Sequence, residues 1–333
     1  MAGSSAAVIR PPLYRTRGLS VVLVLGVVVL LGRATAIGQA AIVETFVLIF
    51  VSIVVEALPF VLLGALVSAV IEVYVPERAF TRMSALPVRL QLPAAALGGL
   101  AFPVCECGSV PVARRLIARG VHPAAGLAFM LASPILNPVV LASTVVAYSG
   151  RGLAWEMTLG RAGLGLILAI AAGWAIGADK ASELLRPRRE ESAHVHEGPK
   201  KTAFVEHLAA DFFFMGRFVV LGAALAAALQ TAIPQSIVAG IARTPIIGSL
   251  SLMAIAFVLS LCSEADAFVA VSFTQFPLGS QLAFLVFGPV VDAKLTFLYG
   301  ATFRRRFVAR LILIAVPIVL AGSLWFEALV VQR

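Results

Sequence analysis

The chain has 333 residues, of which 60 % are hydrophobic and only 13 % charged, and its mean hydropathy is +1.00. Soluble domains carry roughly 25 % charged residues, so this composition excludes a soluble globular protein and indicates an all-α polytopic membrane protein. The apolar runs are continuous rather than alternating, which also excludes a transmembrane barrel. The net charge of +9 comes from arginines lying between hydrophobic segments, so we interpret it as a determinant of topology rather than of nucleic-acid binding.

The N-terminal region carries the first apolar run, at residues 19–31. Three arginines precede this run, and Ala34-Thr35-Ala36 after it has the form of a signal-peptidase site. A second long run begins at Val43, and polytopic proteins commonly start with an uncleaved anchor. We therefore predict a cytoplasmic tail and a first transmembrane helix over residues 1–42, with a cleaved signal peptide as the alternative.

The next two segments differ in the length of their apolar runs. Residues 43–75 form a run long enough to cross a bilayer at a tilt, with Pro59 in its middle. From residue 92 onward, Pro and Gly interrupt the apolar sequence at short intervals. Residues 92–104 are too short to cross and residues 113–119 are too polar. Together they predict a re-entrant helical hairpin.

Two further crossings complete the first half. Residues 123–149 are predicted to cross with a break at Ser133-Pro134-Ile135-Leu136-Asn137-Pro138. Residues 159–177 are a plain span, and its Gly173-x-x-x-Gly177 pattern indicates generic close packing rather than a specific dimer face.

A polar stretch separates the halves of the chain. Residues 179–201 hold eleven charged residues together with Pro and Gly, which predicts a mobile linker. His194 and His196 could bind a metal ion there, but a solvated linker is the preferred interpretation. We divide the rest into repeat 1 over residues 43–178, a cytoplasmic linker over 179–206 and repeat 2 over 207–333.

The two halves share residues at constant spacing. An offset of 155 places Cys107 on Cys262, Pro134 on Pro289 and Asn137 on Asp292 without a gap. Further upstream the offset is 158, where the Phe-Val-x-Leu-Gly stretch ending at Gly64 meets the one ending at Gly222. Shared Cys, Pro and Gly at fixed offsets predict an internal duplication.

Orientation follows from the basic residues, because loops rich in Lys and Arg stay in the cytoplasm. With the N-terminus inside, repeat 1 enters from outside and repeat 2 enters from inside, so the repeats run in opposite senses. Most of the 26 basic residues then fall on the cytoplasmic side. The exceptions are Arg33, Arg151, Arg243 and Arg333 outside, and Arg161, Arg217 and Lys294 in or near spans.

Inverted repeats with discontinuous helices are the plan of secondary transporters, whose solute site lies near the midplane. Each half has one hairpin tip and one broken span, and all three cysteines fall at the tips. Three convergent sulfurs suit a soft ligand such as a trivalent metalloid or Cu(I), and intramembrane carboxylates are costly unless they serve a partner or a solute. The predicted substrate-binding residues are Cys105, Glu106, Cys107, Gly108, Asn137, Cys262, Ser263, Glu264, Asp266, Asp292 and Lys294.

These residues also have structural interpretations. A buried cysteine is often only a small apolar residue, and acids at the hairpin tips could be stabilised by helix N-termini. Asp292 and Lys294 could pair in an unwound segment. Glu56 and Arg217 occupy near-equivalent positions in the repeats, and we expect a structural ion pair between them.

At these motifs the chain resembles a known family, the predicted permeases that include the ArsP-type organoarsenical efflux permeases and the YraQ-like (UPF0718/DUF318) proteins. The matching motifs are P-x-C-x-C-G-S-x-P at residues 103–111, S-P-x-x-N-P at 133–138 and C-S-x-A-D-A-F-V-A at 262–270. The resemblance covers about residues 43–326. It implies a permease of the bacterial cytoplasmic membrane, with export of trivalent organoarsenicals in one branch, and it leaves the substrate open.

Two function classes remain at this stage. The first is a permease for a small solute, plausibly exporting a thiophilic species. The second is a membrane thiol-disulfide oxidoreductase in which Cys105 and Cys107 cycle and Cys262 resolves a mixed disulfide. An inverted duplication has no evident use in that chemistry, so we prefer a non-enzymatic permease. We expect no cofactor, no resident metal ion and no nucleic-acid partner; a homodimer is a further possibility, and no nucleotide-binding loop is present.

Overall fold

The computed structural model describes most of the chain and is helical throughout the described part, apart from one isolated antiparallel bridge between Leu185 and Phe303. The described residues are 41–76, 78, 80, 82, 85–101, 104–179, 181–187, 200–232 and 245–331. The predicted first helix at residues 19–31, the cleavage-like Ala34-Thr35-Ala36 and the His194/His196 pair lie outside them.

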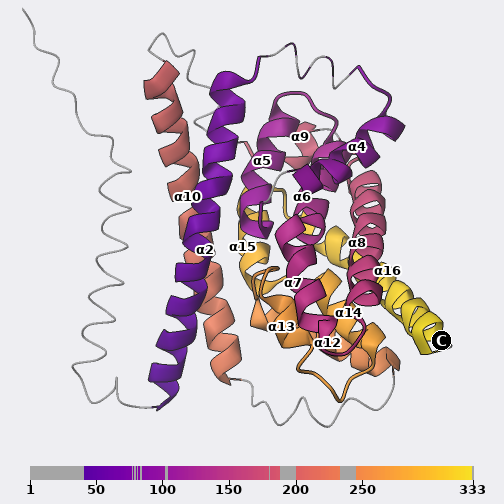
Figure 1. Ribbon diagram of the computed structural model, residues 1–333. Coiled ribbons are helices and arrows are strands. Elements are labelled where there is room, and N and C mark those ends of the chain that lie inside the picture. Colours follow the sequence, from indigo (N-terminus) through magenta and orange to yellow (C-terminus); the bar gives the residue numbers. More distant parts are fainter. Residues whose placement is uncertain are drawn as a thin grey trace, which may run out of the picture. The chain divides into compact units, whose positions relative to one another are not determined.

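Figure 1 shows the described helices, which we give in chain order. The first half has α2 (Ala41–Tyr74), α4 (Val88–Ala101), α5 (Glu106–Ala118), α6 (Pro123–Leu136), α7 (Pro138–Ser149) and α8 (Ala154–Ile176). The short α9 (Ala181–Leu184) follows. The second half has α10 (Lys200–Ala232), α12 (Pro245–Leu259), α13 (Asp266–Ala270), α14 (Leu278–Phe287), α15 (Ala293–Thr302) and α16 (Arg306–Val331).

Contacts divide the chain into two units, Met1–Leu48 and Ile49–Arg333. The structure describes the first unit only from Ala41, where α2 begins. The rest of α2 and every later helix belong to the second unit.

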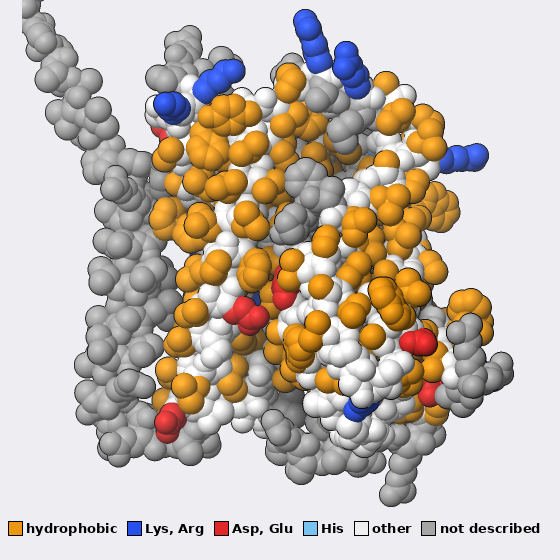
Figure 2. Space-filling view, viewed as in Figure 1, with side chains coloured by type: hydrophobic (Ala, Val, Ile, Leu, Met, Phe, Trp, Pro, Cys, Tyr) orange, Lys and Arg blue, Asp and Glu red, His pale blue; other side chains and the backbone are white. Residues whose placement is uncertain are grey.

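Five helical segments of the described residues are long and apolar enough to cross a membrane, which agrees with a polytopic membrane protein. They are residues 43–74, 123–149, 154–176, 200–232 and 306–330. Many of their large apolar side chains are exposed, as lipid contact requires, and Figure 2 shows hydrophobic side chains over most of one face. Trp155 and Trp174 lie near the two ends of α8, roughly 28 Å apart at 1.5 Å per residue, which suits the two interfaces of a bilayer.

The second candidate span is interrupted where the sequence predicts a break. Helix α6 ends at Leu136 and α7 begins at Pro138, with Asn137 between them in a non-helical conformation. Pro138 has no backbone N–H to donate, so it is favoured in the first turn of a new helix and not in the interior of a continuous one. In the most apolar window of this segment 83 % of residues are buried, against 17 % in α2. Helix α6 lies inside the protein, whereas α7 buries only Val140, Thr144 and Tyr148.

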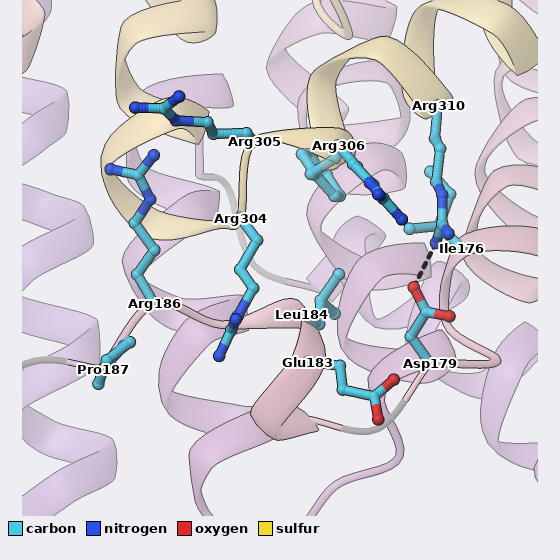
Figure 3. A pocket seen from close by; sticks show the side chains of 11 residues that line it. Ile176, Asp179, Glu183, Leu184, Arg186, Pro187, Arg304, Arg305, Arg306 and Arg310 are labelled. Carbon is cyan, nitrogen blue, oxygen red and sulfur yellow. Dashed lines mark hydrogen bonds and ion pairs between the residues drawn. The ribbon is translucent and has the colours of Figure 1, made fainter.

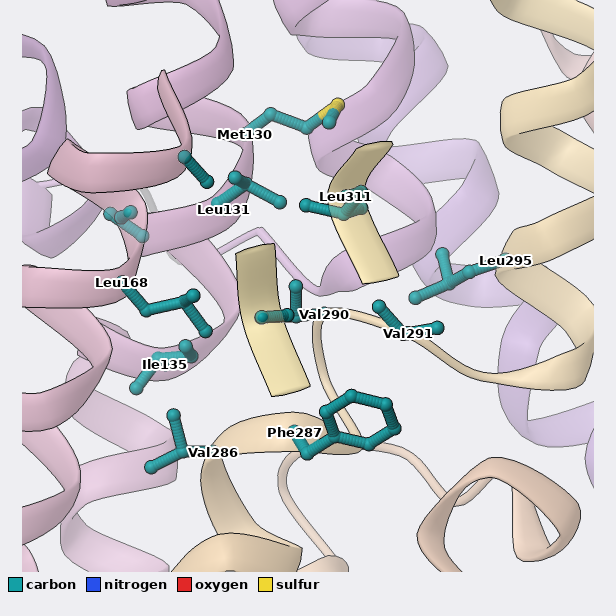
Figure 4. Packing of buried hydrophobic residues seen from close by; sticks show 14 of the residues in the cluster. Met130, Leu131, Ile135, Leu168, Val286, Phe287, Val290, Val291, Leu295 and Leu311 are labelled. Carbon is teal, nitrogen blue, oxygen red and sulfur yellow. The ribbon is translucent and has the colours of Figure 1, made fainter. Parts of the chain in front are cut away.

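The largest apolar cluster of the described residues is formed by both halves. Leu131 and Ile135 of α6 and Leu168 of α8 pack near Val290, which belongs to the turn between α14 and α15 (Figure 4). Glycines permit the closest helix contacts: Gly173 and Gly177 of α8 lie directly on α6, at Ala124. The Gly-x-x-x-Gly pattern therefore serves close packing within the chain, as expected.

The structure describes part of the predicted linker. Residues 181–187 include α9 and the Leu185–Phe303 bridge, which attach this stretch to the segment before α16. Helix α10 begins at Lys200, earlier than the boundary at 207 that we predicted for repeat 2. The charges of this stretch predict that it is solvated. They do not predict its backbone hydrogen bonds with residues 302–304, because those residues lie far away in the sequence.

Candidate functional site

Both cysteine motifs reach one small buried cavity. Its volume is about 10 Å³, room for about one water molecule. Helix α2, the start of α5, the segment before α13 and α15 all contribute to its wall. The residues that line it are Ile53, Glu56, Ala57, Phe60, Cys105, Glu106, Cys107, Cys262 and Lys294. Halfway down the face in Figure 2, acidic side chains lie among hydrophobic ones.

The first motif is the N-terminus of α5. Cys105 is the N-cap residue, with extended backbone angles, and Glu106 is the first helical residue. A carboxylate there is favoured by the positive end of the helix dipole. Gly108, in the first turn, lies against Gly64 of α2. A Cβ at Gly64 would overlap the backbone of Gly108, and a Cβ at Gly108 would overlap the side chain of Val104 and crowd α2. Gly108 therefore sets how closely α5 approaches α2 and does not line the cavity.

The second motif follows α12, where the chain leaves the helix at Ser260. This residue has φ of 47°, and its hydroxyl accepts a 3.1 Å hydrogen bond from the backbone N–H of Ala293. The thiol of Cys262 then donates to Glu264 Oε2 at 2.6 Å. The hydroxyl of Ser263 lies 3.0 Å from Glu106 Oε2 and 3.4 Å from Glu264 Oε2, so it links the two motifs.

Lys294, in the first turn of α15, supplies the positive charge of the site. Its ammonium lies 2.9 Å from Glu106 Oε1 and 3.6 Å from Asp292 Oδ2, and it donates to the carbonyl of Leu261 at 3.3 Å. All three charged side chains are buried. Burying these charges is compensated by their mutual pairing, so removal of the lysine would leave two uncompensated carboxylates.

The same groups could hold a cation. Glu106, Cys262 and Glu264 each offer one ligand atom, and these three atoms lie within 4.8 Å of one another. A thiolate with carboxylates suits a soft or borderline ion better than Mg²⁺ or Ca²⁺, which prefer all-oxygen sites. Cys105 and Cys107 on the same cavity wall add further sulfur nearby.

Asp266, which the sequence predicts to bind substrate, is not among the residues that line this cavity. Its carboxylate forms two hydrogen bonds with the guanidinium of Arg161, at 2.9 and 2.7 Å, and both side chains are buried. Arg161 also donates to Thr144 Oγ1 at 2.9 Å and to the carbonyl of Ser263 at 3.2 Å. Asp266 is therefore engaged in holding α8 to the second motif.

Asn137 and Asp292 have the same structural role. The side chain of Asn137 accepts from the backbone N–H of Val139 at 2.9 Å, capping α7. Asp292 Oδ1 accepts from the N–H of Leu295 at 2.6 Å, capping α15. Asp292 also reaches Lys294, so it has a role at the site that Asn137 does not share.

The expected ion pair between Glu56 and Arg217 is absent from the described part of the chain. The guanidinium of Arg217 instead lies over the rings of Phe214 and Phe218, 4.7 and 4.9 Å from their centroids. Glu56 lines the cavity. Aromatic neighbours three residues before and one residue after Arg217 therefore provide it with local cation–π partners.

Sequence reasoning missed two polar networks. It placed Arg161 in a span without assigning the partner that a buried charge requires. It also treated the basic end of α5 as a topology signal, whereas Arg115 is buried and pairs with Asp211 of α10 at 3.1 Å and with Glu72 of α2 at 3.3 Å. The available signals were the charges inside long apolar runs, Arg161 in the first case and Asp211, the partner of Arg115, in the second.

Comparisons with protein families and with known proteins both identify relatives of this chain. The family described as "Predicted permease" matches residues 42–327. The chain is similar to the UPF0718 protein YcgR of Bacillus subtilis (strain 168), with 43 % identity over 281 residues, covering 83 % of this chain and 95 % of the relative. It is also similar to a Streptococcus mutans protein described as "Putative two-component membrane permease complex subunit", with 33 % identity over 279 residues, covering 79 % and 89 % respectively. No solved structure matches the chain.

Proposed function

Because the chain belongs to the predicted permease family, we propose that it carries a small thiophilic solute across the bacterial cytoplasmic membrane. The solute class is a trivalent (organo)arsenical or a soft metal ion, and the proposed direction is export. The observation that carries this proposal is the gathering of three thiols, buried carboxylates and one lysine around a single cavity. Sulfur ligands select soft ions and metalloids over the hard cations that are abundant in cells.

Pseudo-symmetry of the helices supports an alternating-access mechanism. Helices α2, α4, α5, α6, α7 and α8 correspond in order to α10, α12, α13, α14, α15 and α16. Helix α4 packs on α6 as α12 packs on α14, and α5 contacts α15 as α13 contacts α7. Tyr74 lies beside Phe204 and Ser68 bonds to Asp211, so α2 and α10 run in opposite directions. These pairings are those expected of two inverted repeats, each with a re-entrant hairpin.

The proposed orientation places the N-terminus in the cytoplasm. In Figure 2 the Lys and Arg side chains on this face gather mainly at the edge where α10 begins, and fewer lie at the opposite edge. The end of α2, the end of α5 and the start of α10 meet at that edge, through Glu72, Arg115 and Asp211. A basic edge of this kind is expected on the cytoplasmic side.

The site suggests how binding and proton movement are linked. A thiol must lose its proton to bind a soft ion, and the thiol of Cys262 already donates to Glu264. Glu264 is therefore placed to accept that proton. Before a cation enters, the ammonium of Lys294 neutralises the carboxylate of Glu106. A bound cation would replace Lys294 as the partner of Glu106, and Lys294 would then pair with Asp292, 3.6 Å away.

The described conformation is closed to any solute larger than water. A cavity of about 10 Å³ cannot hold a methylated arsenical. Transport therefore requires α2 and its contact with α5 at Gly64 and Gly108 to open, or the two motifs to separate.

Transport into everted membrane vesicles tests the proposal. The vesicles would contain wild type, Cys107→Ser or Cys262→Ser, and the solutes would be trivalent methylarsenite, Cu(I) and a sulfur-containing anion. We expect wild type to accumulate a thiophilic solute and either variant to lose at least tenfold of the initial rate. A matched control adds Ser272→Cys to Cys262→Ser, which restores the number of thiols at an exposed position. Rescue by this control would contradict a positioned sulfur site.

The same vesicles separate a permease from a thiol-disulfide oxidoreductase. With a dithiol reductant and a disulfide substrate added, an oxidoreductase consumes two reductant thiols for every disulfide that it reduces, whereas a permease moves its solute without consuming the reductant. Since one relative is described as a complex subunit, co-purification at native expression would also show whether a second subunit or a homodimer accompanies the chain.

A further inference from the structure

A second, much larger cavity lies away from the cysteine site, at the end of α8 and the start of α16. Its volume is about 630 Å³, and five arginines line it: Arg186, Arg304, Arg305, Arg306 and Arg310. Figure 3 shows the side chains of Arg306 and Arg310 directed toward Asp179. The other polar lining group is Glu183, so the formal charge of the lining is +3.

The wall of this cavity is held by backbone bonds. The N–H of Arg186 donates to the carbonyl of Thr302, and that of Arg304 donates to the carbonyl of Leu184, both at 3.0 Å. The guanidinium of Arg304 also donates to Ser182 O at 3.1 Å. Buried Arg114 of α5 donates to the carbonyls of Arg186 and Thr302, at 3.0 and 3.3 Å. The arginines therefore project from a fixed frame rather than from a loose linker.

Several of the arginines have no acidic partner within the described residues. Arg310 pairs with Asp179. Arg186, Arg305 and Arg306 have no ion pair there, although Glu183 lines the same cavity. A topology signal requires only that basic residues lie on the cytoplasmic side. Membrane topology alone does not require that unpaired guanidinium groups line a cavity whose wall is fixed by backbone hydrogen bonds.

We propose that this cavity binds an anion that carries a phosphate group. Guanidinium groups present forked N–H donors that match phosphate oxygens in pairs, which lysine does not offer. The position at the ends of two candidate spans puts the cavity at the level of lipid headgroups, where basic pockets bind anionic lipids. A soluble phosphate ester has the same recognition chemistry, so the experiment must distinguish the two sources.

The test uses the purified full-length protein in a neutral detergent. Thermal unfolding is measured with increasing inorganic phosphate, glycerol phosphate, short-chain phosphatidylglycerol or short-chain phosphatidylcholine. A ligand that binds only the folded state raises its stability with the logarithm of one plus the ratio of free ligand concentration to Kd, so the titration gives the affinity. The cavity variant is Arg305→Gln/Arg306→Gln. The matched control is Lys200→Gln/Lys201→Gln, which removes two exposed charges near the start of α10, outside the lining.

Wild type should bind at least one of the phosphate-bearing anions more tightly than phosphatidylcholine. The cavity variant should lose at least tenfold in affinity, and the control less than twofold. Binding of phosphatidylglycerol alone assigns a lipid headgroup, whereas equal binding of glycerol phosphate assigns a soluble ester. Arg305→Lys/Arg306→Lys keeps the charge and should fall between wild type and the Gln variant. Equal losses in the cavity and control variants, or no binding by wild type, would overturn the proposal.

Discussion

The ion pair between Arg161 and Asp266 gives the sharpest stability prediction. Both side chains are almost completely buried, at 0 and 4 % exposure, and the pair is bidentate. Asp266→Ala leaves the guanidinium with only Thr144 Oγ1 and the carbonyl of Ser263 as partners. Breaking a buried pair by removing one member costs about 3–5 kcal/mol. For a chain of this size we expect the melting temperature to fall on the order of 10 °C.

The assay is thermal unfolding of the purified protein in detergent, with Asp179→Ala as the control. Asp179 also pairs with an arginine, Arg310, but those side chains are 34 and 44 % exposed. An exposed pair contributes less than about 1 kcal/mol, so the control should melt close to wild type. Adding Arg161→Met to Asp266→Ala should recover much of the loss, because the unpaired buried cation is then gone. Equal melting temperatures for Asp266→Ala and Asp179→Ala would refute the reasoning.

Three further predictions follow from individual contacts. Gly222→Ala should destabilise the protein by about 1–3 kcal/mol, because the added Cβ would overlap the Lys294 backbone; Gly216→Ala on the same helix faces open space and should melt like wild type. Asn137→Ala should cost about 1 kcal/mol of unfolding free energy by removing the cap of α7, with Asn137→Asp restoring it; equal melting of the two would count against a capping role. Lys294→Met should abolish vesicle transport while Lys294→Arg retains part of it, because Glu106 needs a cation when no solute is bound; full activity of the Met variant would contradict that role.

Local sequence features predicted the helical elements well. Composition alone excluded a soluble protein, because long apolar runs have no stable alternative to helix in a bilayer. The break at Asn137 followed from Pro138, since proline is unfavourable in a helix interior, and the structure ends α6 and begins α7 there. Family membership could likewise be inferred from the Cys-Pro-Gly motifs and agrees with the comparisons.

Side-chain pairing was harder to predict. Glu56 and Arg217 match between the halves, yet Arg217 contacts two rings of its own helix. Asp266 lies four residues after Cys262 in the sequence, yet its carboxylate points to Arg161 of α8. A side chain's partner cannot be inferred from its position in a repeat or from its distance along the sequence. The partner depends on how each helix is rotated about its axis and how closely it packs on its neighbours.

The sequence by itself therefore determined a membrane protein of apolar helices with breaks at defined prolines and three cysteines at the break points. Those properties depend on local backbone chemistry and on the cost of exposing polar groups to lipid. Only the tertiary structure decided that Lys294 pairs with Glu106, that Asp266 pairs with Arg161, and that five arginines surround a second cavity. A buried charge must find a partner, but only the packing of the helices determines which partner lies within reach.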